Sequence, residues 1–165
     1  MKTQEIKTQQ ITFDDVVRAF VHGAKLVEID NIPGVLKLNI LRIFTSLEVE
    51  YRSFSSANES LNKRFYKADL VKRHQELHQI LTVEKSTQSE LVEEYSRINV
   101  ELSNAKSDLD KELRAVLESK TQVITPLLST ADIDRLAEQE GVTAKCLMAI
   151  APFIDTSEPE NKPEN

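Results

Sequence analysis

Residues 40–68 read ILRIFTSLEVEYRSFSSANESLNKRFYKA, and large apolar side chains recur through them at alternating steps of four and three residues. This spacing is the heptad pattern that keeps one apolar seam on the same side of an α-helix. The stretch therefore predicts a long helix that packs along its seam. The seam positions are Ile40, Phe44, Leu47, Tyr51, Phe54, Asn58, Leu61, Phe65 and Ala68.

A second seam follows further along the chain. No glycine or proline occurs between Gly34 and Pro126, so this whole span lacks the usual helix breakers. Residues 82–89 are the poorest in helix formers, which places a turn there. We predict helices over 35–82 and 88–119 that pair as a long antiparallel, coiled-coil-like hairpin. The second seam comprises Leu91, Tyr95, Ile98, Leu102, Ala105 and Leu109, after which Leu113 and Leu117 shift the phase.

The ends of the chain have a different pattern. Residues 5–11 and 121–127 contain β-branched side chains, and the two segments could pair in a small two-stranded β element. A pair of short helices is expected over 129–151, because Ser129 and Asp132 match a capping box. The fold class is therefore mainly α, with short helices flanking the hairpin.

The domain prediction follows from these elements. Thr12 and Asp15 match a second capping box, at the start of an amphipathic helix near the N-terminus. We expect residues 1–154 to form a single elongated helical domain. Residues 155–165, DTSEPENKPEN, have the composition of a disordered acidic tail.

Composition narrows the classes of function. The net charge is −6 and 29% of the residues are charged, which disfavours a general binder of nucleic acid or anionic membranes. No apolar run approaches the ~20 residues that span a bilayer. Cys146 is the only cysteine, so a reducing intracellular setting is expected. The three glycines form no phosphate-binding loop and no catalytic motif is present, so we expect no enzymatic activity, no catalytic residues and no cofactor.

The segment HQELH at 74–78 raises the question of a zinc site. In the zinc-protease pattern H-E-x-x-H, the glutamate follows the first histidine and reaches the metal-bound water. Gln75 occupies that position here, and the only other histidine of the chain is His22. A zinc site needs at least three protein ligands. We therefore predict no metal site, and expect His74 and His78 to be structural residues on or near the helix seam.

Basic residues are densest in KRFYKADLVKR, residues 63–73. Interleaved with Phe65 and Tyr66, these charges would suit phosphates or an acidic protein partner. The alternative interpretation is an ordinary solvated helix face. The candidate partner-binding residues are Lys63, Arg64, Lys67, Lys72 and Arg73.

The sequence of residues 133–150 is IDRLAEQEGVTAKCLMAI. Its residues have the spacing of a helix-turn-helix DNA-binding motif, with Gly141 at the turn and Thr143 as the N-cap of the second helix. Thr143 and Lys145 are the residues that would contact bases or phosphates. Electrostatics argues against DNA, because residues 129–151 contain four acidic and two basic side chains. The alternative interpretation is two short helices that fold back on the hairpin.

The order of these elements resembles a family of small uncharacterised proteins encoded by tailed bacteriophages. The segments that carry the resemblance are QITFDDVVRAF, NIPGVLKLNILRI, SLEVEYRSFSSANESLNKRF, LRAVLES, QVITPL and APFID. The function of that family is not established. The resemblance implies a phage origin and a non-catalytic role, and it assigns no site residues.

Two functions from different classes are consistent with these features. The first is a phage-encoded helical interaction protein that acts in virion assembly, as a minor virion component, or on a host factor. Its partner would be a phage structural protein, a host protein or a second copy bound through the helices, in the host cytoplasm or in the virion. The second is a DNA-binding regulator that reads DNA through 133–150 and dimerises through the hairpin. No membrane is involved in either.

Overall fold

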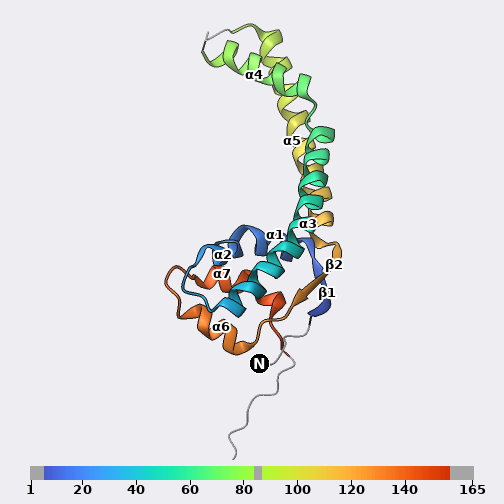
Figure 1. The fold of residues 1–165 in the computed structure, drawn as a ribbon. Coiled ribbons are helices and arrows are strands. Elements are labelled where there is room, and N and C mark those ends of the chain that lie inside the picture. The colour runs from blue at the N-terminus through green and yellow to red at the C-terminus, as the bar shows by residue number, and fades with distance from the viewer. Residues whose placement is uncertain (1–5, 84–86, 157–165) are drawn as a thin grey trace, which may run out of the picture. The chain divides into compact units, whose positions relative to one another are not determined.

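The computed structural model describes residues 6–83 and 87–156 (Figure 1). The chain divides into two compact units. Of the described residues, 6–53 and 118–156 form the first unit, and those between 54 and 117 form the second. The assignment of residues 1–154 to a single elongated domain stays a prediction.

The described residues are mainly helical, with one two-stranded antiparallel sheet, as predicted. The two long helices are α3 (Gly34–Phe65) and α5 (Ser89–Glu118). In chain order the elements are β1 (Ile6–Thr12), α1 (Phe13–Arg18), the π-helix η1 (Ala19–Gly23), α2 (Lys25–Glu28), α3 (Gly34–Phe65), α4 (Ala68–Thr82), α5 (Ser89–Glu118), β2 (Lys120–Pro126), α6 (Thr130–Ala137), α7 (Ala144–Ala149) and the 3₁₀-helix η2 (Ala151–Phe153).

The sheet joins the two ends of the chain in the first unit. β1 and β2 are antiparallel, and their register runs from the pair of Ile6 with Pro126 to the pair of Thr12 with Lys120. Successive side chains of a strand point to opposite faces. Ile11 and Val123 are accordingly buried in the core. The pairing of the two predicted segments is confirmed.

The core of the first unit lies around the first part of α3. Ile40, Phe44 and Leu47, the first three positions of the predicted seam, are buried there. Both predicted capping boxes are present, at the starts of α1 and α6. Figure 1 shows α1, α2, α6 and α7 grouped around this part of α3. The core also contains Val16, Leu26, Leu128, Leu136, Ile150 and Phe153.

The second unit is the predicted antiparallel hairpin. The end of α3 and all of α4 form one arm, and α5 forms the other (Figure 1). The seam predictions hold at Phe54, Ile98 and Leu109, which are all buried. His74 of α4 contacts Asn99 of α5, and His78, one turn later on α4, contacts Tyr95, one turn earlier on α5. The two helices therefore run in opposite directions.

The first arm of the hairpin is not the single helix predicted over 35–82. It is interrupted at Tyr66 and Lys67, and Lys67 has extended backbone angles, with φ of −62° and ψ of 125°. The seam explains the interruption. Continuing the spacing from Phe65 leads to Ala68, which is exposed, whereas the apolar stripe of α4 starts at Leu70.

The apolar seam of α3 and the apolar stripe of α4 are thus two residues out of phase. At about 100° per residue, an unbroken helix would turn the stripe of α4 roughly 200° away from α5. A break in the helix allows both stripes to face the same partner. The stripe of α4 comprises Leu70, His74, Leu77 and Leu81, and none of these four side chains is exposed.

Two predicted segments fall partly outside the described residues. The helices end at Thr82 and begin again at Ser89, which agrees with the predicted turn, but residues 84–86 are not described. The acidic tail was expected from Asp155. This residue belongs to the fold, because its N–H donates to the carbonyl of Leu128 at 2.8 Å. The remainder of the predicted tail, from residue 157 onward, lies outside the described residues.

Candidate interaction surfaces

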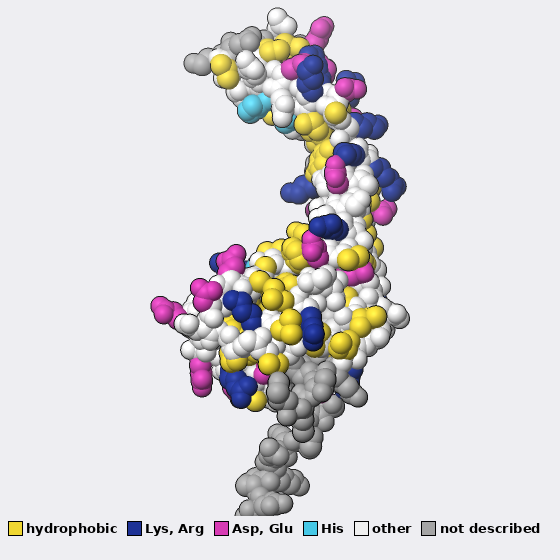
Figure 2. All heavy atoms as spheres, in the orientation of Figure 1, with side chains coloured by type: hydrophobic (Ala, Val, Ile, Leu, Met, Phe, Trp, Pro, Cys, Tyr) yellow, Lys and Arg dark blue, Asp and Glu magenta, His cyan; other side chains and the backbone are white. Residues whose placement is uncertain are grey.

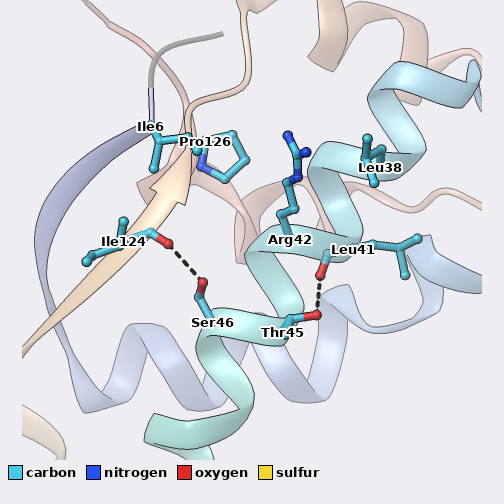
Figure 3. A pocket seen from close by; sticks show the side chains of 8 residues that line it. All are labelled: Ile6, Leu38, Leu41, Arg42, Thr45, Ser46, Ile124 and Pro126. Carbon is cyan, nitrogen blue, oxygen red and sulfur yellow. Dashed lines mark hydrogen bonds between the residues drawn. The ribbon is translucent and has the colours of Figure 1, made fainter.

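A groove of about 450 Å³ lies between the sheet and the first part of α3, within the first unit (Figure 3). The strands contribute the side chains of one wall, and α3 contributes those of the other. Arg42 extends in this view towards the opening between Pro126 and Leu38. The lining residues are Ile6, Leu38, Leu41, Arg42, Thr45, Ser46, Ile124 and Pro126.

Two hydrogen bonds hold the walls of the groove together. The Ser46 hydroxyl on α3 donates to the carbonyl of Ile124 on β2 at 2.8 Å (Figure 3). One turn further along α3, Glu50 accepts a hydrogen bond of 2.7 Å from the Thr121 hydroxyl of β2. The groove is therefore bounded by two elements that are directly bonded to each other, which makes it a preformed feature of this unit.

The groove is lined by exposed apolar side chains. Ile6 is 59% exposed, Ile124 63%, Leu38 46% and Leu41 40%. Figure 2 shows yellow hydrophobic side chains reaching the surface of the first unit, with dark blue basic side chains among them. Single exposed apolar residues are common, but four that line one groove form a contiguous patch, and such patches mark binding sites. Arg42, at the same groove, forms no ion pair within the described residues.

Sequence reasoning did not find this groove. Ile6 and Ile124 are more than a hundred residues apart in the chain, and only the strand register brings them together. One local signal was present. Leu38 and Leu41 are large apolar residues of α3 that lie outside the predicted seam, and the hairpin had no position at which to bury them.

The basic cluster lies in the second unit, at the interruption between α3 and α4, and its members have different surroundings. Lys63 pairs with Glu59, and Lys72 lies 4.0 Å from the carboxylate of Glu76. Both contacts are between exposed residues one helical turn apart, where an ion pair contributes little to stability. These two lysines therefore remain accessible to a partner.

Arg73 is engaged inside the hairpin. Its guanidinium donates hydrogen bonds of 2.8 and 2.7 Å to the carboxylate of Glu94 on α5. These hydrogen bonds and the positive charge lower the pKa of Glu94. The Lys63 ammonium lowers the pKa of Glu59 in the same way. Arg73 thus has a structural contact within the hairpin, and its place in a partner-binding surface stays a prediction.

Arg64 and Lys67 are the residues of the cluster that are least engaged. The guanidinium carbon of Arg64 lies 5.1 Å from the centre of the neighbouring Phe65 ring. Neither side chain forms an ion pair within the part of the chain that the structure describes. Of the five predicted residues, these two are the best placed to meet an external anionic group.

The HQELH segment forms contacts between α4 and α5. The His74 ring stacks on Tyr95, with 4.9 Å between ring centres, and its Nε2 lies 2.7 Å from Oδ1 of Asn99. The more exposed His78 has its Nδ1 3.1 Å from the Tyr95 hydroxyl. Both imidazoles thus contact the opposite helix. Across residues 6–83 and 87–156, no group of three or more His, Cys, Asp or Glu side chains could hold a metal ion.

The helix-turn-helix-like segment forms two short helices, α6 and α7. Lys145 is exposed, but the Thr143 hydroxyl caps α7 and accepts a hydrogen bond from the N–H of Cys146. α7 has only 6 residues, and Pro152 follows in η2. A recognition helix needs length to reach along the major groove, and this one has less than two turns. The geometry offers no specific support for DNA reading.

No protein-family model, curated protein or solved structure matches this chain. Within the described residues, no helix combines the length and the apolar character needed to cross a bilayer.

Proposed function

We propose that this protein is a non-catalytic, phage-encoded interaction protein that binds another protein through the groove of its first unit. Its role would be in virion assembly, as a minor virion component, or on a host factor. The phage origin is supported by the resemblance in the order of elements. On that basis the protein would act in the host cytoplasm or within the virion.

One observation carries the proposal of protein binding. Ile6, Leu38, Leu41 and Ile124 are each at least 40% exposed and line one groove. Leaving such a patch in water has a free-energy cost of roughly 25 cal/mol for every Å² of apolar surface, and a partner that covers the patch recovers it.

Photo-cross-linking in infected cells tests this function. A photoreactive amino acid replaces Leu41 in one variant and Val49 in another. Both residues are exposed on α3, but only Leu41 lines the groove. We expect a discrete cross-linked product from position 41, containing a phage or host protein identified by mass spectrometry. Absence of a product at position 41, or the same products from both positions, would overturn the proposal.

A further inference from the structure

Pairing of an added strand with β2 is disfavoured at the groove. A peptide often binds a sheet by adding a strand, which requires free N–H and C=O groups at the edge. Here the carbonyl of Ile124 already accepts the Ser46 hydroxyl, and Pro126, two residues further along β2, has no N–H to donate. A ligand must therefore bind the groove mainly through its side chains.

An α-helix meets this requirement. Its backbone hydrogen bonds are satisfied internally, and residues three or four apart present their side chains on one face. The walls of the groove offer apolar contacts from Leu38 and Leu41 on one side and from Ile6 and Ile124 on the other. The apolar face of an amphipathic helix would contact both walls.

Arg42 adds a positive charge to the lining of the groove. Its side chain is exposed and lines the groove, and no carboxylate of the described residues forms an ion pair with it. A guanidinium can bind a carboxylate through two parallel hydrogen bonds, which is stronger and more directional than a neutral contact. Because Arg42 forms no ion pair with the described residues, it favours a ligand with Asp or Glu close to its apolar residues.

The remaining segments of this chain lack the chemistry to fill the groove. Residues 1–5, MKTQE, contain Met1 as their only large apolar side chain. Residues 157–165, SEPENKPEN, contain carboxylates but no large apolar residue other than proline. Neither segment combines an apolar helix face with a carboxylate, so a helix of a separate chain fits the groove better than either of them.

We infer that the groove binds an amphipathic helix of a protein partner, in which large apolar residues and a carboxylate lie on the same face. The apolar residues pack between α3 and the sheet, and the carboxylate pairs with Arg42. This inference rests on the proposed function and specifies the chemistry of the partner at the same site.

The test uses the full-length protein and synthetic helical peptides of about 16 residues, long enough to populate a helix. Each peptide carries two leucines four residues apart. A glutamate is placed three, four or seven residues beyond them, and matched peptides carry glutamine or lysine instead. Binding is measured by fluorescence anisotropy, and methyl NMR of Ile6, Leu38, Leu41 and Ile124 locates the bound peptide.

We expect the best glutamate peptide to bind at least about tenfold more tightly than its lysine counterpart, as expected for a charge-assisted contact. Arg42→Gln should remove this preference, and Arg42→Glu should reverse it. Leu41→Ser should weaken every peptide. Val49→Ser, on the same helix but outside the groove, serves as the control and should change binding by less than about twofold.

The inference is overturned if no peptide binds, if glutamate and lysine peptides bind equally, or if Val49→Ser weakens binding as much as Arg42→Gln. A cross-linked partner at position 41 combined with any of these results would leave the proposed function intact and refute the partner chemistry. If position 41 captures no partner, the proposed function itself fails.

Discussion

Arg73 on α4 and Glu94 on α5 form a bidentate ion pair across the hairpin, with hydrogen bonds of 2.8 and 2.7 Å. Arg73 also lies 3.5 Å from Glu76 of its own helix. The pair links two helices that are otherwise joined mainly by the apolar seam. It also makes the hairpin sensitive to acid, because only the ionised form of Glu94 accepts both hydrogen bonds.

The first prediction concerns the pH dependence of this pair. The pKa of Glu94 is lower in the folded protein, because Arg73 hydrogen-bonds to its carboxylate. The pair therefore contributes fully above the unfolded pKa of about 4.3, and this contribution is lost as the pH falls through the lower, folded pKa. We expect Glu94→Gln to lower the Tm at pH 7 and the difference from the wild type to shrink below about pH 4.

Calorimetry between pH 7 and below about pH 4 measures the difference in Tm, with Glu93→Gln as the control. A difference that stays constant at low pH would contradict the prediction.

The second prediction concerns Gly23 at the end of the π-helix. A Cβ atom at this position would lie 2.9 Å from Cζ of Phe44 and 3.2 Å from Cγ2 of Ile150. Both neighbours are buried, so they have little room to move. We expect Gly23→Ala to reduce the free energy of unfolding by about 1–3 kcal/mol, as for overpacked cores.

Gly34 provides the matched control for this substitution. A Cβ atom there would have no neighbour within 4 Å. Gly34→Ala should be neutral or stabilise by about 0.4–1 kcal/mol, because alanine restricts the unfolded chain. Urea denaturation compares the two variants, and equal effects would show that crowding at Gly23 is not the cause.

The third prediction uses two threonines of β2. The Thr125 side chain is fully buried, and its hydroxyl has no hydrogen-bond partner within the described residues. An unsatisfied buried polar group costs about 1–3 kcal/mol, so Thr125→Val should stabilise the protein by an amount in or below this range. The Thr121 hydroxyl donates to Glu50, and Thr121→Val should destabilise by about 1 kcal/mol. Thermal unfolding of both variants is the measurement. A loss of stability in Thr125→Val would reveal a partner for its hydroxyl.

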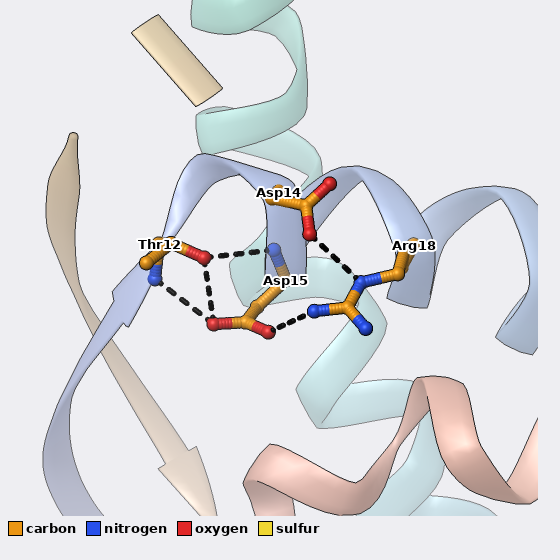
Figure 4. Close-up of polar contacts among 4 residues, drawn as sticks. All are labelled: Thr12, Asp14, Asp15 and Arg18. Atoms are coloured by element: carbon orange, nitrogen blue, oxygen red, sulfur yellow. Dashed lines mark hydrogen bonds and ion pairs between the residues drawn. The ribbon is translucent and has the colours of Figure 1, made fainter. Parts of the chain in front are cut away.

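The fourth prediction concerns the junction of β1 and α1. The Thr12 hydroxyl accepts from the N–H of Asp15 at 3.1 Å, and the Asp15 carboxylate accepts from the N–H of Thr12 at 3.1 Å (Figure 4). Arg18 donates to the other oxygen of the same carboxylate at 2.8 Å. Thr12→Ala should cost about 1 kcal/mol, and Thr12→Ser should retain most of the stability because it keeps the hydroxyl. Chemical denaturation distinguishes them, and equal losses would argue against the cap as the cause.

The fifth prediction tests the seam itself. Phe54 is a seam residue and is 9% exposed, whereas Val49 lies off the seam and is 63% exposed. Phe54→Ala should cost about 3–5 kcal/mol, as for truncation of a buried aromatic side chain. Val49→Ala should change stability by less than about 0.5 kcal/mol, as for most surface positions. Circular dichroism during urea denaturation measures both variants, and a small effect at Phe54 would mean that the seam is not packed.

The long helices could be predicted because a heptad depends only on spacing along the chain. Phe54, Ile98 and Leu109 were assigned to buried positions in this way and are buried. The break at Tyr66 and Lys67 was missed, because neither glycine nor proline marks it. Its signal was the two-residue phase shift between Phe65 and Leu70, which is visible in the sequence once the two stripes are compared.

The groove could not be predicted in the same way. Its walls come from β1, β2 and α3, and their proximity depends on a strand register and on the bond from Ser46 to Ile124. The pairing of the two strands was predicted from their β-branched side chains, but the register and the contact of β2 with α3 are long-range properties that no local pattern encodes. The ion pair of Arg73 was missed for a related reason, because its partner Glu94 lies on the other helix of the hairpin.

The pairing of the two chain ends has a consequence for folding during synthesis. Ile6 pairs with Pro126, so β1 leaves the ribosome long before β2 has been made. At roughly 5–20 residues per second, the delay is on the order of ten seconds. All of residues 54–117, the hairpin, is synthesised before β2, so this segment can form before the sheet closes. The first unit is therefore the last part of the chain to fold, and a chain released before β2 would leave β1 as an unpaired strand that is prone to aggregate.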